Sequence, residues 1–435
     1  MRFALPGATA VALLALAACA DQPTPLAPSS DITASAARSG ANGRHGKVAG
    51  AVYSMSNDPA GNHVVAYRRF ESGHLDRLES YPTGGTGSGG FEDTANGMIL
   101  GNARGESSPN NLNESEKFLF VTNAGSNSIT VFKVMPKGGL KLVEVQPSGG
   151  EKPVSVTVNH GLLYVLHSGE FMDGEITTPN CTTGNLPSVT GFRVSANGHL
   201  EPIPNSTRHL SEDHHSGCAQ VSFTPNGRVL VVTERLAGDE DPTSAAGDEG
   251  YIVTFVVKED GRLGQRRITD ATGQGPFGFT FNKQGALFTT EQFDGSMGPN
   301  QGAAAGYMVN DDGTLTPASP SVHNGGTDTC WFVITDDGKY GFATSFFGDG
   351  RISSYLVKPN GGLELLNATA NTDQVDQGAS DISLSEDSRY LYQLNSFKGT
   401  INVFRVGNDG GLTYLETVQA QAPSPLAAPL GISAF

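Results

Sequence analysis

The chain has 435 residues, of which 37% are hydrophobic and 17% charged, and it contains 56 glycines but a single tryptophan. This composition is typical of a turn-rich, all-β protein and is poor in helix-forming residues. The formal net charge of −16 argues against nucleic acid as a partner and against unaided adhesion to anionic lipid.

The first residues have the pattern that predicts an export signal. Arg2 precedes an apolar run from Ala8 to Ala18 that is too short to span a bilayer as a permanent helix. The run ends in Leu-Ala-Ala before Cys19, which resembles a bacterial lipoprotein signal that is cleaved after residue 18 and acylated on the Cys19 thiol. An ordinary signal peptide cut after Ala18 is the alternative. We expect a protein anchored by lipid to the outer membrane or cell surface, or else secreted.

Residues 19–46 form the next predicted segment. They are rich in Pro, Ser and Ala, a composition that cannot bury a core and predicts a disordered tether. The folded domain is expected to span residues 47–435.

That domain repeats one fifteen-residue pattern seven times, at 64–78, 129–143, 189–203, 252–266, 304–318, 352–366 and 401–415. Each copy reads as an alternating strand, a turn and a second strand, which predicts a β-hairpin. The fourth position is always aromatic, at Tyr67, Phe132, Phe192, Phe255, Tyr307, Tyr355 and Phe404. The tenth is always glycine, at Gly73, Gly138, Gly198, Gly261, Gly313, Gly361 and Gly410. The twelfth is always leucine, at Leu75, Leu140, Leu200, Leu263, Leu315, Leu363 and Leu412. Such regularity defines a repeat protein.

Two further strands joined by a tight turn separate consecutive hairpins, most clearly at 218–234, 277–291, 330–344 and 381–395. Each unit therefore has four antiparallel strands, and seven such units around an axis make an all-β, seven-bladed β-propeller.

The first unit lacks its own first strand. Residues 429–435 match the first-strand pattern of 276–281, so the C-terminal segment should join the first blade and close the ring.

The long connections all fall on one predicted face of this ring. They are 84–96, 101–116, 169–188, 205–217, 236–250, 293–303 and 367–378. Connections on the opposite face are uniformly short. Because long loops gathered on one face are where sites usually lie, we expect the site there, at the axial mouth.

Charged residues at strand ends are the candidate catalytic groups. Glu234 and Glu291 end the second strands of neighbouring units, and Arg235 is the residue after Glu234. Two carboxylates that converge on a channel can raise one pKa, as a general acid or base near neutral pH requires. Hydrogen-bonded channel lining is the alternative. Arg235 could hold a substrate carboxylate through two hydrogen bonds or simply neutralise a glutamate.

His215, with His214 beside it, stands just before the first strand of the fourth unit. A histidine there could transfer a proton to a bound ring, or it could be merely solvated. Further residues expected to line the mouth and bind substrate are His167, Gln220, Trp331, Asn395 and Asn123.

The remaining cysteines suggest one disulfide. Cys181 and Cys218 both fall in connections between the third and fourth units, so we expect them to pair, with no disulfide at all as the alternative. Cys330, next to Trp331, is expected to be a buried thiol. No His, Cys or Asp cluster has zinc spacing, and we expect neither a metal nor a cofactor.

Several segments, 52–57, 120–127, 153–158, 220–235 and 330–333, resemble the seven-bladed propeller lactonase-like family. That family includes bacterial 6-phosphogluconolactonases and fungal 3-carboxymuconate cyclases, and the likeness is greater to its secreted bacterial branch. The resemblance implies metal-independent opening or closing of a lactone ring by His, Glu and Arg near the axial mouth. At the matching positions of this chain these are His215, Glu234 and Arg235.

We therefore expect a lactone hydrolase or muconate-type cyclase that acts on a small organic-acid or sugar-acid substrate. Glu234 or Glu291 would activate water, His215 would act as the acid, and Arg235 would hold a carboxylate or developing oxyanion. The alternative is a non-catalytic surface lipoprotein whose loop-rich face binds a glycan, peptide or partner protein. The expected ligand is a small lactone or carboxylate, and the expected state is a monomer.

Overall fold

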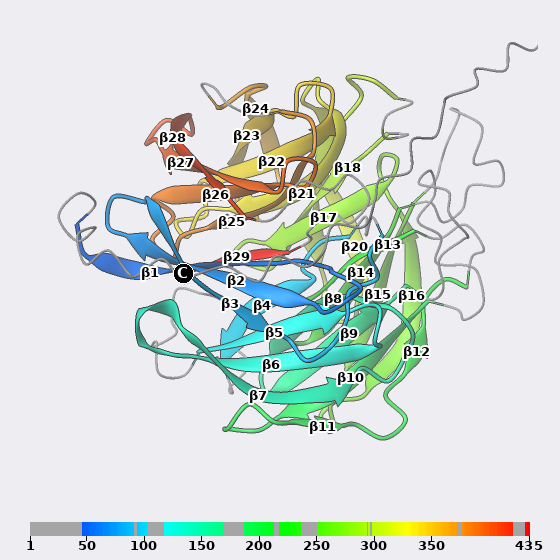
Figure 1. The fold of residues 1–435 in the computed structure, drawn as a ribbon. Coiled ribbons are helices and arrows are strands. Elements are labelled where there is room, and N and C mark those ends of the chain that lie inside the picture. The colour runs from blue at the N-terminus through cyan, green and yellow to red at the C-terminus, as the bar shows by residue number, and fades with distance from the viewer. Residues whose placement is uncertain are drawn as a thin grey trace, which may run out of the picture. The chain divides into compact units, whose positions relative to one another are not determined.

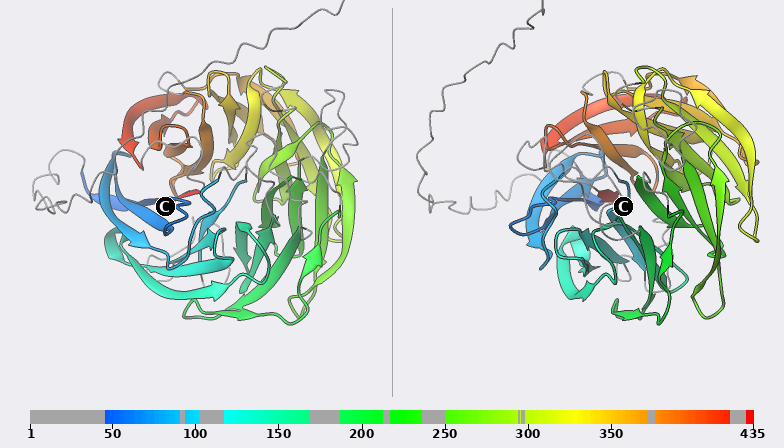
Figure 2. Two further views of the ribbon diagram at one scale, coloured as in Figure 1. Left: turned by 45° about the vertical axis from the view of Figure 1, so that its right-hand side comes forward. Right: turned by 90° about the vertical axis from the view of Figure 1, so that its right-hand side faces the viewer.

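The computed structural model describes residues 46–90, 94–102, 117–168, 187–212, 217–235, 250–293, 295, 298–371, 376–420 and 431–435. Strands within these ranges form seven antiparallel sheets, which stand as blades around a common axis (Figures 1 and 2). The predicted seven-bladed propeller is therefore confirmed. Within the same ranges no helix is long and apolar enough to cross a membrane.

The strands follow one another from the innermost to the outermost position of each blade, except that the first blade takes its innermost strand from the end of the chain. The first blade contains β29 (Ile432–Ala434), β1 (Val48–Met55), β2 (His63–Phe70) and β3 (Leu75–Pro82). The second contains β4 (Met98–Asn102), β5 (Lys117–Asn123), β6 (Ser128–Val134) and β7 (Leu140–Pro147), with the short 3-10 helix η4 (Pro136–Gly138) between the last two. The third contains β8 (Pro153–Asn159), β9 (Leu162–His167), β10 (Ser188–Val194), β11 (Leu200–Pro202) and β12 (Arg208–His209).

The fourth blade contains β13 (Cys218–Phe223), β14 (Val229–Glu234), β15 (Tyr251–Val257) and β16 (Leu263–Asp270). The fifth contains β17 (Pro276–Phe281), β18 (Ala286–Glu291), β19 (Ala303–Val309) and β20 (Leu315–His323). The sixth contains β21 (Thr327–Ile334), β22 (Tyr340–Phe347), β23 (Ile352–Val357) and β24 (Leu363–Asn367). The seventh contains β25 (Ala379–Leu384), β26 (Tyr390–Asn395), β27 (Thr400–Val406) and β28 (Leu412–Gln419).

The ring closes as expected, through the last strand of the chain. β29 pairs antiparallel with β1, placing Ala434 opposite Val52 and Ile432 opposite Ser54. In Figure 1 the red β29 lies beside the blue β1. Arg69 of β2 reinforces the seam, because its Nε donates to the main-chain oxygen of Phe435 at 2.7 Å. Closure removes the edge that the inner side of β1 would otherwise expose.

The hydrophobic core lies between neighbouring blades. Leu230 and Val232 of β14 share one cluster with Leu166 of the third blade, whereas Val229 and Val231 share another with Leu287 of the fifth. Side chains along a strand alternate between its two faces, and each face of a blade packs on a different neighbour. The odd or even position of a residue therefore decides which seam between blades it enters.

The repeated hairpin residues pack these seams. All seven aromatic residues are at most 1% exposed. All seven glycines have positive φ, between 76° and 88°, which only glycine adopts without strain. They also touch the preceding blade, since a Cβ on Gly198 would lie 2.4 Å from the ring of Phe118. The hydroxyl of Tyr164 in the third blade donates to the carbonyl of Gly261 in the fourth at 2.8 Å.

The outer strand of the third blade is broken in two. β11 ends at Pro202, and β12 resumes at Arg208 against the other end of β10. Pro202 and Pro204 lie at the break and have no N–H to donate, whereas Ile203 between them still donates to the Gly191 carbonyl at 3.0 Å. The intervening residues turn inward, and the Oγ of Ser206 bonds to the main chain of Gly191.

Candidate functional site

The face on which first strands begin and second strands end is here called the mouth face. A polar or charged side chain at the end of the second strand, or two residues before it in the sixth blade, is buried in six of the blades, at Asn123, His167, Glu234, Glu291, Ser345 and Asn395. The loop entering the same blade packs against several of these side chains. A Cβ on Gly150 would lie 2.6 Å from the His167 ring, and one on Gly273 would lie 2.5 Å from Glu291 Oε2. These side chains therefore enter the seams between blades, each beneath its own loop.

Glu234 is fully buried in the seam between the third and fourth blades. Its Oε2 accepts a hydrogen bond from the main-chain N–H of Ser211 at 3.0 Å, and its Oε1 accepts one from Ser211 Oγ at 2.9 Å. Donors aimed at both oxygens stabilise the charged form of a carboxylate. Glu234 thus anchors the loop that enters the fourth blade.

Arg235 enters the opposite seam, toward the fifth blade, because it is the next residue along the strand. Its neighbour on that face, Thr233, confirms the direction by donating from Oγ1 to the Phe277 carbonyl of the fifth blade at 2.7 Å. The Arg235 side chain is only 7% exposed, and its Nη1 donates to Gln292 Oε1 at 3.3 Å. Gln292 in turn donates from Nε2 to the sulfur of Cys330 at 3.2 Å, which links three blades through polar side chains.

Glu291 lies in that same seam between the fourth and fifth blades. It shares its strand face with Leu287, which packs on Val231 of the fourth blade. Oε1 accepts a hydrogen bond from Thr272 Oγ1 at 3.2 Å, while Oε2 has no hydrogen bond of normal geometry to the described residues. Burial raises the pKa of Glu291, and hydrogen bonding from Ser321 and Thr272 offsets only part of the rise.

The two glutamates accordingly do not face each other, since alternation sends them into different seams. We expected their mutual repulsion to raise one pKa, but burial is the cause of the raised pKa of Glu291. The structure instead brings Arg235 and Glu291 into one seam. Gln292, the hydrogen-bond partner of Arg235, is the residue after Glu291.

His167 is 1% exposed at the end of β9, facing the second blade. Both ring nitrogens lack a hydrogen bond of normal geometry. Burial lowers the pKa of His167 to about 4, although main-chain groups of Ser188 and Ser148 partly oppose this shift. The imidazole is therefore neutral near pH 7.

Three predicted binding residues hold the fold together through their amides. Asn123 Nδ2 donates to Thr130 Oγ1 at 2.8 Å, and Asn395 Nδ2 donates to the Asp376 carbonyl at 3.2 Å. The Gln220 amide donates to the Phe279 carbonyl at 2.7 Å and accepts from the Phe279 N–H at 2.8 Å, which joins the first strands of the fourth and fifth blades.

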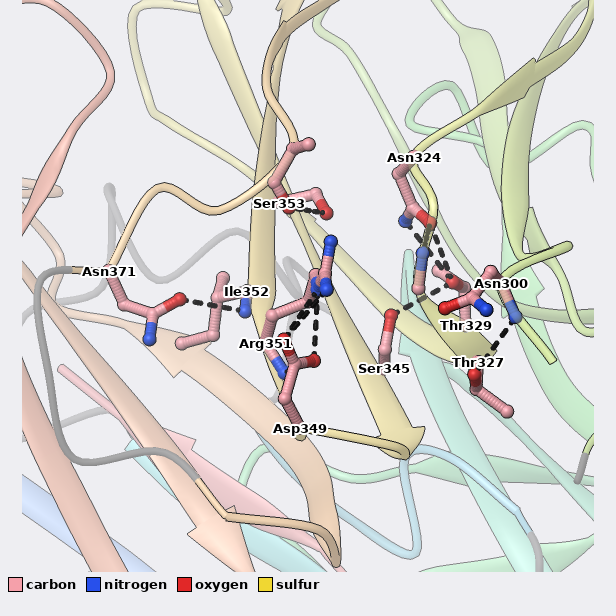
Figure 3. A network of polar contacts seen from close by, with 12 residues as sticks. Asn300, Asn324, Thr327, Thr329, Ser345, Asp349, Arg351, Ile352, Ser353 and Asn371 are labelled. Carbon is pink, nitrogen blue, oxygen red and sulfur yellow. Dashed lines mark hydrogen bonds and ion pairs between the residues drawn. The ribbon is translucent and has the colours of Figure 1, made fainter.

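Figure 3 shows the corresponding network in the sixth blade. Ser345 Oγ lies 3.1 Å from Thr329 Oγ1, and Asn324 Nδ2 donates to the same Thr329 oxygen at 3.1 Å. Beside this cluster the Arg351 guanidinium faces Asp349, with its Nη2 2.7 Å from Oδ2. Polar anchoring of the mouth-face loops is therefore a property of several blades, with or without ionisable residues.

Aromatic residues occupy the mouth face of the fifth to seventh blades. Trp331 is 2% exposed and contacts Phe277 edge-on, with ring centroids 5.2 Å apart, and Phe346 at 6.1 Å. Phe346 also contacts Phe397 of the seventh blade at 5.0 Å. The indole Nε1 of Trp331 is buried and makes no hydrogen bond to a described residue. The mouth face thus carries His167, Glu234, Arg235 and Glu291 on blades three to five and a cluster of aromatic residues on blades five to seven.

Some predicted residues lie outside the described ranges, namely Cys19, Cys181, His214 and His215. Cys218 is buried at the start of β13, and its pairing with Cys181 stays a prediction. Cys330 is buried as expected, and its thiol donates to the Asp328 carbonyl at 3.2 Å. Within the described part of the chain, no group of three or more His, Cys, Asp or Glu side chains is placed to hold a metal ion.

Comparison with known families agrees with this architecture. Residues 60–189 and 186–296 match the family described as "Lactonase, 7-bladed beta-propeller", and together they cover more than half of the chain. The chain belongs to this lactonase family.

Relatives of this lactonase-family propeller include a 6-phosphogluconolactonase of Klebsiella pneumoniae (strain 342). It is 24% identical over 344 residues, which cover 71% of this chain and 82% of the relative. A putative 6-phosphogluconolactonase from Bacteroides uniformis has a TM-score of 0.61 at 14% identity, covering 89% of this chain and 100% of that one. The Pseudomonas aeruginosa periplasmic gluconolactonase PpgL has a TM-score of 0.59 at 14% identity, covering 88% and 99%. The likeness to the two structures supports the fold alone.

Two residues of this lactonase-family site were missed by sequence reasoning. Gln292 holds Arg235, and aligning the repeats would have found it, because Gln292 follows Glu291 as Arg235 follows Glu234. Asp381, near the start of β25, is 4% exposed, and burial raises its pKa to about 7 against hydrogen bonds from the main chain of Ile382, Ile432 and Asn96. The sequence pattern predicts strands at 381–395, but it does not mark Asp381 as a buried titratable group.

Proposed function

We propose that this protein hydrolyses a lactone of a small organic acid or sugar acid, at the seam that contains Arg235 and Glu291. Membership of the lactonase family supports the reaction class, and relatives named 6-phosphogluconolactonase support a lactone as substrate. The observation that carries the proposal is that a buried guanidinium and a buried carboxylate enter the same seam at the mouth face.

Glu291 is the better of the two glutamates for the role of base. Its pKa is raised by burial, and its Oε2 has no hydrogen bond of normal geometry, so that oxygen can accept a proton from water. Both oxygens of Glu234 already accept hydrogen bonds from Ser211. Glu234 therefore holds the loop that contains Ser211 in place and is not assigned a step in the reaction.

In the proposed reaction Arg235 donates hydrogen bonds to the carbonyl oxygen of the lactone and stabilises the negative charge that develops there. Water attacks the carbonyl carbon as its proton passes to Glu291. The ring C–O bond then breaks, and the departing ring oxygen takes a proton from His215, which yields the hydroxy acid. The protonated Glu291 and the neutral His215 return to their starting states by exchange with solvent.

A panel of lactones that includes 6-phosphogluconolactone and gluconolactone, followed by acid release, tests the proposal. We expect Glu291→Gln to lower kcat/KM by about a hundredfold or more and Arg235→Lys by about tenfold or more, as loss of a proton acceptor or an oxyanion donor does. Glu364→Gln is the matched control, because Glu364 is an exposed residue of β24 far from the mouth chemistry. Melting temperatures establish that each variant is folded.

The pH profile adds an independent check. Protonation of Glu291 abolishes the base, so kcat/KM of the wild type should fall on the acid side, with a midpoint above the ordinary glutamate range because the pKa is raised. If Glu291→Gln stays fully active, the assignment of the base is wrong. If no lactone in the panel is opened, the hydrolase proposal fails and ligand binding at the loop-rich face becomes the better account.

A further inference from the structure

A groove opens between the outer strands of the third and fourth blades. Its volume is about 590 Å³, within the range of small-molecule sites. It is lined by Thr207, Arg208, His209, Glu212, Phe255, Lys258, Leu263, Gly264, Gln265 and Arg266. The groove lies apart from the Arg235 and Glu291 seam, which is on the other face of the fourth blade.

The groove coincides with the break in the outer strand of the third blade. β12 begins at Arg208, separated from β11 by five residues that belong to neither strand. One wall of the groove is formed by Thr207, Arg208, His209 and Glu212. β16 of the fourth blade, with the turn that contains Lys258, forms the other. In the other blades the outer strand is continuous in the described residues, so this feature belongs to one seam.

The lining is basic, although the whole chain has a net charge of −16. Arg208, Lys258 and Arg266 contribute three cations, and Glu212 is the one acidic residue of the lining. Glu212 is paired with Arg266, whose Nη1 lies 2.9 Å from Oε1. The pairing leaves Arg208 and Lys258 without an acidic partner among the residues that line the groove.

Main-chain carbonyls hold both guanidinium groups in place. Arg208 donates from Nη1 to the carbonyls of Asn205 and Thr207, at 3.1 and 2.7 Å, and from Nη2 to that of Leu263 at 3.2 Å. Arg266 Nη1 donates to the Leu210 carbonyl as well as to Glu212. Each arginine keeps Nε and at least one Nη2 proton that bond to no described residue. Fixed guanidinium groups lose little entropy when they bind an anion.

The deeper lining is apolar, since Phe255 and Leu263 are at most 1% exposed. An apolar floor with a few oriented charges is the usual make-up of a small-ligand site. We propose that this groove binds a small organic anion of sugar size that carries carboxylate or phosphate groups. Arg208 and Arg266 bind the anionic group through charge-assisted hydrogen bonds, and Lys258 contributes longer-range attraction.

Calorimetric titration of the full chain with citrate, inorganic phosphate and glucose tests the proposal. We expect at least one anion to bind and neutral glucose not to bind. The anion that binds shows whether carboxylate or phosphate is preferred. The double variant Arg208→Gln with Arg266→Gln should weaken binding by about tenfold or more, and added salt should weaken it further.

Arg389→Gln with Lys398→Gln, on the seventh blade, is the matched control, because it changes the net charge equally at exposed positions and should leave binding unchanged. If the double groove variant fails to fold, the exposed Lys258→Gln replaces it and should still weaken binding measurably. Unchanged affinity in a folded groove variant overturns the proposal. So does equal binding of glucose, or no binding of either anion at about 10 mM, where even a Kd of 1 mM would give near-saturation.

Discussion

Ser211 shows how a single small residue can govern a buried charge. Its N–H and its hydroxyl bond to the two oxygens of Glu234, one each, at 3.0 and 2.9 Å. Burying a carboxylate costs free energy unless hydrogen-bond donors replace the lost water. Here the main-chain N–H and the hydroxyl of one residue supply two such donors. Glu291 has a weaker arrangement, with a single bond of normal geometry from Thr272 Oγ1, which fits its raised pKa.

We expect Ser211→Ala to lower the free energy of unfolding by about 1–3 kcal/mol, because a hydrogen bond to a buried charged group is lost while the main-chain bond remains. Urea unfolding measures the change. Ser195→Ala is the control, since Ser195 Oγ accepts only from His199 N–H in an exposed turn, and it should change stability by less than about 0.5 kcal/mol. Equal effects of the two variants would contradict the anchoring role of Ser211.

At the scale of single residues, the sequence identified which residues belong to the site better than it identified which seam each side chain enters. Glu234, Arg235 and Glu291 were found because the repeat makes strand ends comparable. Their directions follow from alternation along the strand, which already requires consecutive residues such as Glu234 and Arg235 to enter opposite seams. The partners Ser211 and Thr272 stand in loops, where no periodic pattern links a residue to the side chain it will contact.

The hairpin turn is the element that joins one blade to the next. Its glycine has a positive φ and also lies against the preceding blade, so two separate constraints act on one position. For Gly198 the values are a φ of +84° and a hypothetical Cβ 2.4 Å from the Phe118 ring. Gly285, in the turn between β17 and β18, has a φ of +86° but nothing within 4 Å of its Cβ position.

Comparing Gly285 with Gly198 separates the cost of backbone strain from the cost of crowding between blades. Gly285→Ala should cost about 1 kcal/mol, the usual penalty for an L-residue in the left-handed region. Gly198→Ala should cost about 1–3 kcal/mol more, because overpacking adds to the strain. Denaturant unfolding of both variants measures the difference. Equal losses would mean that the seam relaxes around the added methyl group.

Element positions were largely predictable, because alternation and turn residues mark strands directly. The seven hairpins and the closing strand were found where the structure has them. The break between β11 and β12 was missed, and residues 205–217 were interpreted as one irregular loop. Pro202 and Pro204 do not mark the break by themselves, because the outer strand β20 continues through Pro317 and Pro320. The two residues of β12 are too few to give a periodic pattern.

At the scale of the whole molecule, two buried groups change the free energy of unfolding in opposite directions as the pH changes. The pKa of Asp381 is raised from 3.8 to about 7, so an unfolded chain releases this proton near pH 4 while the folded protein keeps it. Its contribution to stability is therefore lost as pH rises from about 4 to about 7. The pKa of His167 is lowered from 6.5 to about 4, so its contribution is lost as pH falls through nearly the same interval.

We expect the contributions of Asp381 and His167 to the pH dependence of the free energy of unfolding largely to oppose each other in the wild type. Glu291 adds to the contribution of Asp381, because its pKa is also raised. Relative to the wild type, Asp381→Asn should make the free energy of unfolding fall more on acidification, because the opposing contribution of Asp381 is removed. His167→Asn should make it fall less, or rise. Each single group contributes up to about 1.4 kcal/mol per pH unit. Denaturant unfolding between about pH 4 and 7 gives the slopes, which are informative even if a variant is less stable overall. Slopes identical to that of the wild type would refute the cancellation.

Closure of the ring by β29 has a consequence for the order of synthesis. About 380 residues separate β1 from its inner neighbour, so a chain that emerges N-terminus first, from a ribosome or from an export channel, presents β1 well before β29. During that time six sheets can assemble while the first presents a bare backbone edge to other nascent chains. Chaperones that shield open β-edges should therefore matter most for this protein before β29 has emerged.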